Sequence, residues 1–227
     1  MRVGRAGRIA AGLAGAIVLV LVLAQVFLPG LAANRISSRV GRYGSVENVT
    51  VKAWPAVELL WGHADSVKVR ARNLELSPAQ TGKLLREARG VKKMQLTASS
   101  TQEGPLRLSD VSFHKQGAAL SAQAQISAAD VRAALPEGFD VQLLSSRGGE
   151  VEVRATGGLF GVGASVNAVA HASEGRLVAS PRGFLVGGLQ LTVFSEPHVY
   201  VEGVGASATR GSGGVVSYRL TIRASLR

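Results

Sequence analysis

Histidine and acidic side chains are the first candidates for chemistry in this chain of 227 residues. Its four histidines lie far apart, and only His63 has a carboxylate close by, at Asp65. A zinc site needs three or four ligands at short, regular spacings, and no third ligand follows this pair. The absence of cysteine excludes thiolate metal sites, disulfides and cysteine nucleophiles. We therefore expect no metal, and we interpret His63 as a turn or surface residue.

The sequence also contains no complete catalytic motif. No Gly-x-Ser-x-Gly turn occurs, and the carboxylates of Glu58, Asp65, Asp110 and Asp140 cannot be paired from sequence. The stretch GGLFGVGAS, residues 157–165, resembles a phosphate-binding loop, but it precedes a second alternating segment and lacks Gly-Lys-Ser/Thr. We interpret it as a hairpin connection. We predict no catalytic residue and no cofactor, and an unrecognised hydrolase stays as a lesser alternative.

Basic residues give the chain a formal net charge of +11, but their position matters more than their number. Six arginines precede the first acidic residue, Glu47: Arg2, Arg5, Arg8, Arg35, Arg39 and Arg42. The other 20 basic residues face 15 acidic ones, so the remainder carries only +5. Lys68, Arg70 and Arg72 form one basic face, which is either simply solvated or a patch for anionic headgroups. Nucleic-acid platforms interleave such residues with aromatics, and aromatics make up only 5% here, so we expect no nucleic-acid partner.

The early arginines flank an apolar stretch, Ile9 to Leu28, in which Gln25 is the only polar residue. Twenty such residues are enough to span about 30 Å of hydrocarbon. Residues 1–30 are thus predicted to be a signal anchor or a signal peptide cleaved near Gly30–Ala32; a buried core helix is a third option. Three arginines lie on each side of this stretch, so their numbers do not set its orientation. The N-terminal amine and the position of the stretch near the N-terminus favour a cytoplasmic N-terminus and an extracytoplasmic domain.

The elements after this stretch are predicted by their periodicity. Residues 31–43 form a connecting helix or a linker, which Gly44 ends. From Val46 onward apolar and polar residues alternate, which predicts about ten long strands in an elongated, curved antiparallel sheet. Two capped helices interrupt the strands: one begins at Ser77–Pro78 and ends at Gly90, and the other begins at Ser127 and stops at Pro136. We interpret 44–227 as one domain of an α+β fold.

Two tryptophans and a leucine pair occur at a chain reversal, where polar residues are usual. The segment is WPAVELLW, with Trp54, Pro55, Leu59, Leu60 and Trp61 as its apolar members. Tryptophan favours membrane interfaces because its ring is apolar and its N–H still reaches water. We predict a lip that touches lipid; the alternative is a buried segment in which the leucines pack on the helix after Ser77.

The same region carries a resemblance. VTVKAWPAVELLWGHADSVKVRARNLEL, with Trp54-Pro55, Leu59-Leu60 and Gly62, resembles the LmeA-like phospholipid-binding family of actinobacterial cell-envelope proteins. LRLSDVSF, ISAADVRAAL and GRLVASP also fall where that family has them, and the likeness covers about residues 31–226. AVELLW departs from the aromatic-rich segment, with a Thr or Gln, usual in that family.

This resemblance implies a fold similar to the tubular lipid-binding superfamily, in which a curved antiparallel sheet wraps around helices and encloses an apolar groove. It also implies non-catalytic phospholipid binding that supports envelope lipid or lipoglycan maintenance. We then expect phospholipid and membrane as partners, with Val67, Val69, Leu84 and Leu85 lining the channel. Lys68 or Arg70 would meet the headgroup, and the tryptophan segment would be the entrance. A β-rich envelope scaffold or adhesion domain with a filled core is the main alternative.

Overall fold

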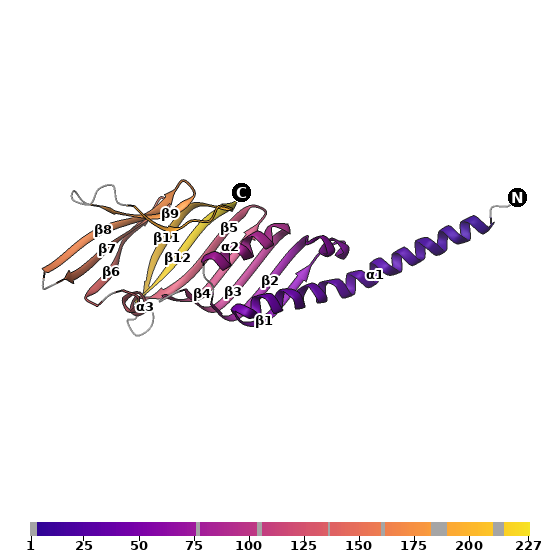
Figure 1. Cartoon of the computed structure of the whole chain (residues 1–227), viewed down its shortest axis with the longest axis horizontal. Coiled ribbons are helices and arrows are strands. Elements are labelled where there is room, and N and C mark those ends of the chain that lie inside the picture. The colour runs from indigo at the N-terminus through magenta and orange to yellow at the C-terminus, as the bar shows by residue number, and fades with distance from the viewer. Residues whose placement is uncertain are drawn as a thin grey trace.

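The structure is a computed structural model that describes the backbone of residues 4–75, 78–103, 106–135, 137–159, 162–182, 190–210 and 216–227. Side chains are described from Val20 onward, except at positions next to the gaps. The expected helix cap Ser77 and helix stop Pro136 lie outside the described residues. In Figure 1 the molecule is elongated, with the N-terminal helix α1 (Gly4–Val40) projecting from one end of a row of strands.

Helix α1 continues through residue 30 without a break, and the short helix η1 (Gly41–Tyr43) follows it. Strand β1 (Gly44–Lys52) then begins at the expected glycine. Gly44 has a φ of 152°, and a Cβ built there would lie 1.9 Å from the carbonyl oxygen of Asn73. Only glycine fits this close backbone approach. The division of the chain into 1–30, 31–43 and 44–227 stays a prediction.

Seven strands form the larger sheet, in the order β1-β2-β3-β4-β5-β12-β11. Their bounds, after β1, are β2 (Ala64–Glu75), β3 (Val91–Glu103), β4 (Leu106–Gln116), β5 (Ala119–Ser127), β12 (Val216–Leu226) and β11 (Val199–Arg210). All neighbours are antiparallel except β2 and β3, which run parallel. The expectation of antiparallel pairing is wrong for this pair. Helix α2 (Pro78–Glu87) and η3 (Ala88–Gly90) form a crossover that returns the chain to the end of the sheet where β2 begins, so β3 runs in the same direction as β2.

Five strands form a second sheet, in the order β10-β9-β8-β7-β6. Their bounds are β6 (Phe139–Arg147), β7 (Glu150–Leu159), β8 (Val162–Ser173), β9 (Arg176–Arg182) and β10 (Leu191–Phe194). The Val201 and Val204 N–H groups of β11 donate to the carbonyls of Gly175 and Gly149, at 2.8 and 3.0 Å, which joins the sheets. The described residues thus form twelve strands in two sheets, whereas about ten strands in one sheet were expected.

Local signals in the sequence are confirmed where the structure describes them. Pro78 is the first residue of α2, as expected for a ring that needs no N–H partner. Helix α3 (Ala128–Ala133) is capped by Ser127, whose Oγ accepts the Asp130 N–H at 3.0 Å. Strands β7 and β8 pair antiparallel up to Leu159 and Val162, so the described residues of the stretch 157–165 belong to a hairpin, as expected. The predicted α+β class, with a long curved sheet and an N-terminal helix, is confirmed (Figure 1).

The core follows the alternation of the strands. On β2 the side chains of Val67, Val69 and Ala71 are at most 3% exposed, whereas Lys68 and Arg70 between them face solvent. Val40 of α1 belongs to the same cluster, and Ala32, Ala33 and Ile36 pack against it. The last two turns of α1 therefore cover the inner face of β1 and β2.

Candidate functional site

An apolar groove runs along the inner face of the larger sheet, beneath α1 and α2. Its volume is about 780 Å³ and it is partly open to solvent. This volume lies in the range of cavities that bind a small organic ligand. Residues from α1, the larger sheet and the second sheet line it, among them Leu28, Leu31, Val69, Phe113, Phe194 and Ile222. Small aliphatic side chains on the strands, such as Val67, Val69 and Ala122, leave this space unfilled.

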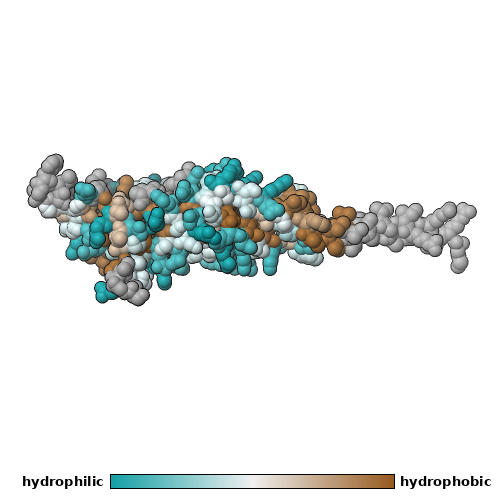
Figure 2. All heavy atoms as spheres, turned by 90° about the horizontal axis from the view of Figure 1, so that it is seen from below, coloured by the Kyte–Doolittle hydropathy of each residue, from teal (hydrophilic) through white to brown (hydrophobic). Residues whose placement is uncertain are grey.

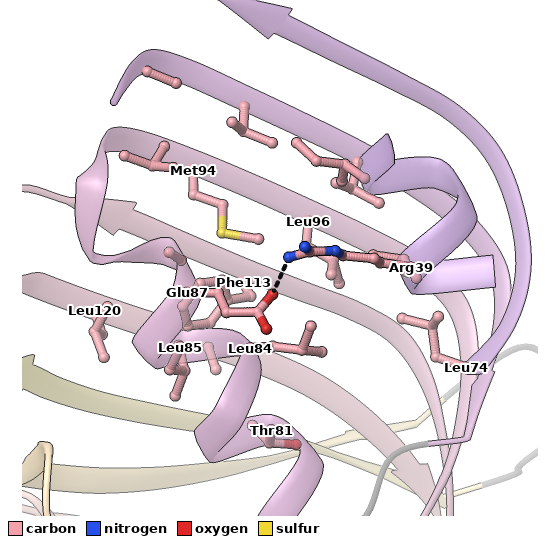
Figure 3. Close-up of a pocket in the computed structure, with 18 of the residues that line it drawn as sticks. Arg39, Leu74, Thr81, Leu84, Leu85, Glu87, Met94, Leu96, Phe113 and Leu120 are labelled. Carbon is pink, nitrogen blue, oxygen red and sulfur yellow. Dashed lines mark hydrogen bonds and ion pairs between the residues drawn. The ribbon is translucent and has the colours of Figure 1, made fainter. Parts of the chain in front are cut away.

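The four predicted channel residues all line the groove. Val67 and Val69 face it from β2 because alternate residues of a strand share one side of a sheet. Leu84 and Leu85 reach it from α2, as Figure 3 shows, with Leu85 buried and Leu84 half-buried. Their role in holding lipid stays a prediction.

Sequence reasoning missed the part of α1 in this groove. Leu28, Leu31, Arg35, Ile36 and Arg39 line it, although residues 31–43 were expected only to connect two parts. The groove wall is therefore continuous with the apolar N-terminal helix. The loose apolar spacing of Leu31, Ile36 and Val40 was the available signal.

The tip, defined as Trp54–Trp61, connects β1 to β2 and contains the short helix η2 (Ala56–Trp61). Trp54, Leu60 and Trp61 are 74%, 67% and 69% exposed, and Pro55 also faces solvent. Leu59 instead packs against the core cluster, and both leucines line the groove. The tip is therefore apolar outside and partly core inside. Its contact with lipid stays a prediction, and Leu59 packs on the cluster that contains Val40, Val51 and Val67.

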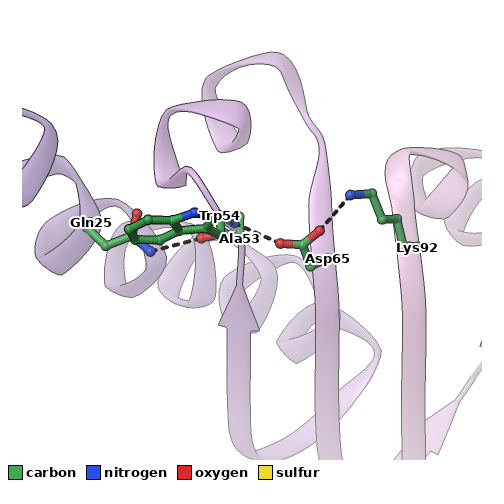
Figure 4. A network of polar contacts seen from close by, with 5 residues as sticks. All are labelled: Gln25, Ala53, Trp54, Asp65 and Lys92. Atoms are coloured by element: carbon green, nitrogen blue, oxygen red, sulfur yellow. Dashed lines mark hydrogen bonds and ion pairs between the residues drawn. The ribbon is translucent and has the colours of Figure 1, made fainter.

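Polar contacts hold the tip in place from two sides (Figure 4). The Gln25 side chain of α1 donates to the Ala53 carbonyl at 3.0 Å and accepts the Ala56 N–H at 2.8 Å. Asp65 accepts the Trp54 N–H and the Lys92 ammonium, both at 2.8 Å. These bonds, the one from Lys92 first, hold the pKa of the Asp65 carboxyl below its usual value.

An exposed apolar surface surrounds the point where α1 meets the tip. We call it the apolar belt: Val26, Phe27, Leu31, Trp54, Leu60 and Trp61, each at least 59% exposed. Figure 2 shows this brown region at the end of the domain where α1 leaves it. Among the residues whose side chains are described, one helical segment, Val20–Tyr43, has the length and composition of a membrane span, criteria that a signal sequence also meets.

The predicted headgroup residues Lys68 and Arg70 lie on the other side of β2 from Val67 and Val69. They are exposed and are not among the residues that line the groove. The basic residues that do line it are Arg35 and Arg39 of α1, together with His63 next to the tip. A direct contact of Lys68 or Arg70 with a headgroup stays a prediction. A lipid in the groove would lie on the opposite face of β2 from these two side chains.

Among the described residues, Asp65 bonds to Trp54 and Lys92 and forms no hydrogen bond or ion pair with His63. Within the ranges described above, no group of three or more His, Cys, Asp or Glu side chains is placed to hold a metal ion. The arrangement offers apolar surface, two arginines and a carboxylate, which suits binding of an amphiphile.

A comparison with protein-family models matches residues 22–223 to a family described as LmeA-like phospholipid-binding. The matched range begins inside α1 and includes the tip, the groove and both sheets. No curated protein and no solved structure matches the chain.

Proposed function

Because this chain belongs to the LmeA-like phospholipid-binding family, we propose that it holds phospholipid acyl chains in the groove. The protein acts without catalysis at the cell envelope, where it supports the maintenance of envelope lipids or lipoglycans. The observation that carries this proposal is a groove of about 780 Å³ that begins beside the apolar belt.

The energetics of lipid extraction require such a groove. Each methylene sheltered from water contributes about 0.8 kcal/mol, so a chain of sixteen carbons needs about 12 kcal/mol of shelter to leave a bilayer. A groove that starts in the membrane lets the methylenes transfer one by one, without passing through water. The lining residues Leu28 and Leu31 of α1 and Leu60 of the tip supply this continuity.

We further propose that the N-terminal helix is retained as a single-pass anchor with the domain outside the cytoplasmic membrane. Cleavage after Ala32 would remove Gln25, which bonds to Ala53 and Ala56. It would also remove Leu28 and Leu31 from the groove wall. An unpaired carbonyl or N–H in an apolar place costs about 1–3 kcal/mol, so the cleaved domain would lose both stability and part of the groove.

The test is lipid analysis of the full chain, purified in detergent and washed extensively. Leu84→Trp fills the groove from α2, whereas Lys83→Trp places the same ring on the exposed side of that helix. Lipids around the anchor are common to both variants, so the comparison isolates the groove. We expect mass spectrometry to find phospholipid with the native chain and Lys83→Trp, and several-fold less with Leu84→Trp.

Equal phospholipid in both variants would exclude the groove as the binding place. A folded native chain that carries no phospholipid beyond the detergent background would favour the envelope scaffold instead. The mass of the intact protein from the same samples tests the anchor, since a retained helix leaves Gln25 in the mature chain.

A further inference from the structure

The groove needs a polar partner for the phosphate of a lipid whose chains it holds. Most of its lining is apolar, and its charged lining residues among those described are Arg35, Arg39 and Glu87. Arg35 and Arg39 stand four residues apart on α1, so they lie on the same face of the helix, one turn above the other. Both arginines and the carboxylate therefore gather at one rim, between α1 and α2.

The contacts of these residues leave room for an anion. Arg39 bonds to Glu87 at 3.0 Å across the groove (Figure 3). The two side chains are 60% and 40% exposed, and such solvent-exposed pairs contribute little to stability. Arg35 lines the groove, faces solvent and has no hydrogen-bond or ion-pair partner in the described part of the chain. A phosphate offers both guanidinium groups several acceptor oxygens at once.

The positions of the two arginines along α1, relative to the end of the apolar stretch, also suit contact with a lipid headgroup. Arg35 follows Leu28, the last residue of the apolar stretch, by seven positions, which is about 10 Å along a helix. Arg39 lies about 6 Å further. The headgroup layer adds about 5–8 Å to each side of the hydrocarbon core. Arg35 therefore stands just beyond the headgroup layer of the outer leaflet, where its long side chain reaches the lipid phosphates, and Arg39 is one turn further along the groove.

We propose that Arg35 and Arg39 form a phosphate-binding subsite at the rim of the groove, where the lipid phosphate displaces Glu87 from Arg39. Arg35 receives the phosphate at the membrane surface, and Arg39 holds it once the acyl chains lie against the apolar lining. Glu87 occupies Arg39 while the groove is empty. This inference rests on the proposed function, because it assigns the headgroup end of the same site.

The experiment compares two labelled lipids with identical acyl chains, phosphatidylglycerol and diacylglycerol, bound to the full chain in detergent micelles. Only the first carries a phosphate. We expect Arg35→Gln and Arg39→Gln each to weaken phosphatidylglycerol binding about tenfold, the effect of one charge-assisted hydrogen bond, and to leave diacylglycerol binding unchanged. Glu87→Gln removes the competing carboxylate, so phosphatidylglycerol should bind more tightly.

Arg42→Gln is the matched control, because Arg42 is an exposed arginine just after α1 that does not line the groove. We expect native affinity for both lipids in this variant. We also expect native affinity for both lipids in a double variant, Lys68→Gln with Arg70→Gln, on the outer face of β2. A loss confined to that double variant would move the headgroup to the outer face and overturn the subsite.

Other outcomes separate this inference from the proposed function. Binding of neither lipid by the native chain would refute the proposed function. Equal weakening of both lipids by Arg35→Gln or Arg39→Gln would mean that the arginines only shape the groove, and the subsite would be refuted. Displacement of phosphatidylglycerol by an equal concentration of inorganic phosphate would indicate a site for free phosphate instead of a lipid.

Discussion

Lys115 is the only buried polar or charged residue among the described positions, at 4% exposure. Its partners in the sheet, Met94 and Leu120, both line the groove, so Lys115 lies on the inner face of β4. Its ammonium donates to the Val91 carbonyl, and burial lowers the pKa of Lys115 below the usual lysine value. A buried cation beside an apolar groove costs stability as long as it stays charged.

The pH dependence of unfolding tests this cost. Because its native pKa is lowered, Lys115 binds its proton more weakly in the folded than in the unfolded chain. The free energy of unfolding therefore rises with pH between the lowered pKa and about 10.4, the usual lysine value. Lys115→Met removes this contribution. We expect denaturant unfolding at pH 7 and pH 10 to show a larger gain with pH for the native chain than for the variant. Parallel pH profiles would contradict this.

Gly44 carries a second prediction at the scale of one residue. Gly44→Ala places a Cβ 1.9 Å from the Asn73 oxygen at a φ of 152°, so we expect a loss of about 1–3 kcal/mol in the free energy of unfolding. Gly41→Ala is the control, because a Cβ at Gly41 meets no atom within 4 Å. Thermal unfolding of both variants measures the difference, and equal midpoints would show that β1 can shift away from β2.

At the scale of elements, the tip and α1 are coupled through Gln25. A glutamine in an apolar helix is costly in hydrocarbon unless its side-chain amide is hydrogen-bonded. Here the Gln25 amide bonds to the Ala53 carbonyl and to the Ala56 N–H, two backbone groups of the tip region. Asp65 and Lys92 fix the other side of the tip. The exposed tryptophans are thereby held beside Val26 and Phe27, the residues that α1 contributes to the apolar belt.

Gln25→Leu should make α1 more apolar yet release the tip. We expect native membrane insertion but faster hydrogen exchange at the Ala56 amide, which loses its acceptor. Val26→Leu changes the neighbouring exposed position and should leave that exchange rate unchanged. Unaltered protection of Ala56 in Gln25→Leu would show that the tip keeps its place without the helix.

Tryptophan fluorescence tests whether the tip touches lipid. The chain has two tryptophans, Trp54 and Trp61, so all of its tryptophan emission comes from the tip. We expect brominated phospholipids to quench this emission in vesicles that contain the full chain, because tryptophan settles at the interface. Quenching by aqueous acrylamide alone would place the tip in water and remove its role as an entrance.

At the scale of the whole molecule, the groove is lined by elements from α1 to the second sheet. Its lining begins at Leu28 in α1 and reaches Ile222 on β12 and Phe194 on β10, in the second sheet. The two sheets and α1 thus line a single groove. Our proposal places an extended acyl chain along it.

Shortening the groove should therefore select among chain lengths. Ile222→Trp fills a part of the groove on β12, which is separated from β1 by four strands of the sheet, and Arg223→Trp puts the same ring on the exposed outer side of β12. We expect Ile222→Trp to reduce retention of long-chain phospholipids several-fold more than that of short-chain ones, whereas Leu84→Trp reduces both. Retention that is independent of chain length in Ile222→Trp would confine the lipid to the part of the groove near α1.

Much of the fold was predictable from the sequence because its signals are local. Alternation places Val67 and Val69 on one face of β2 and Lys68 and Arg70 on the other. Pro78 and Ser127 mark helix starts through the chemistry of a single turn. The length and composition of the apolar stretch Ile9 to Leu28 predict a helix that suits a signal anchor or a signal peptide, and α1 includes this stretch.

The tertiary structure decided which elements meet. Periodicity assigns a face to each strand but does not choose its partner, so the parallel pairing of β2 with β3 and the second sheet were not predicted. The same limit hid the contacts of Gln25 and Arg39, because their partners Ala53, Ala56 and Glu87 lie 28 to 48 residues further along the chain. Such contacts arise from packing between distant segments, for which a single sequence carries no local signal.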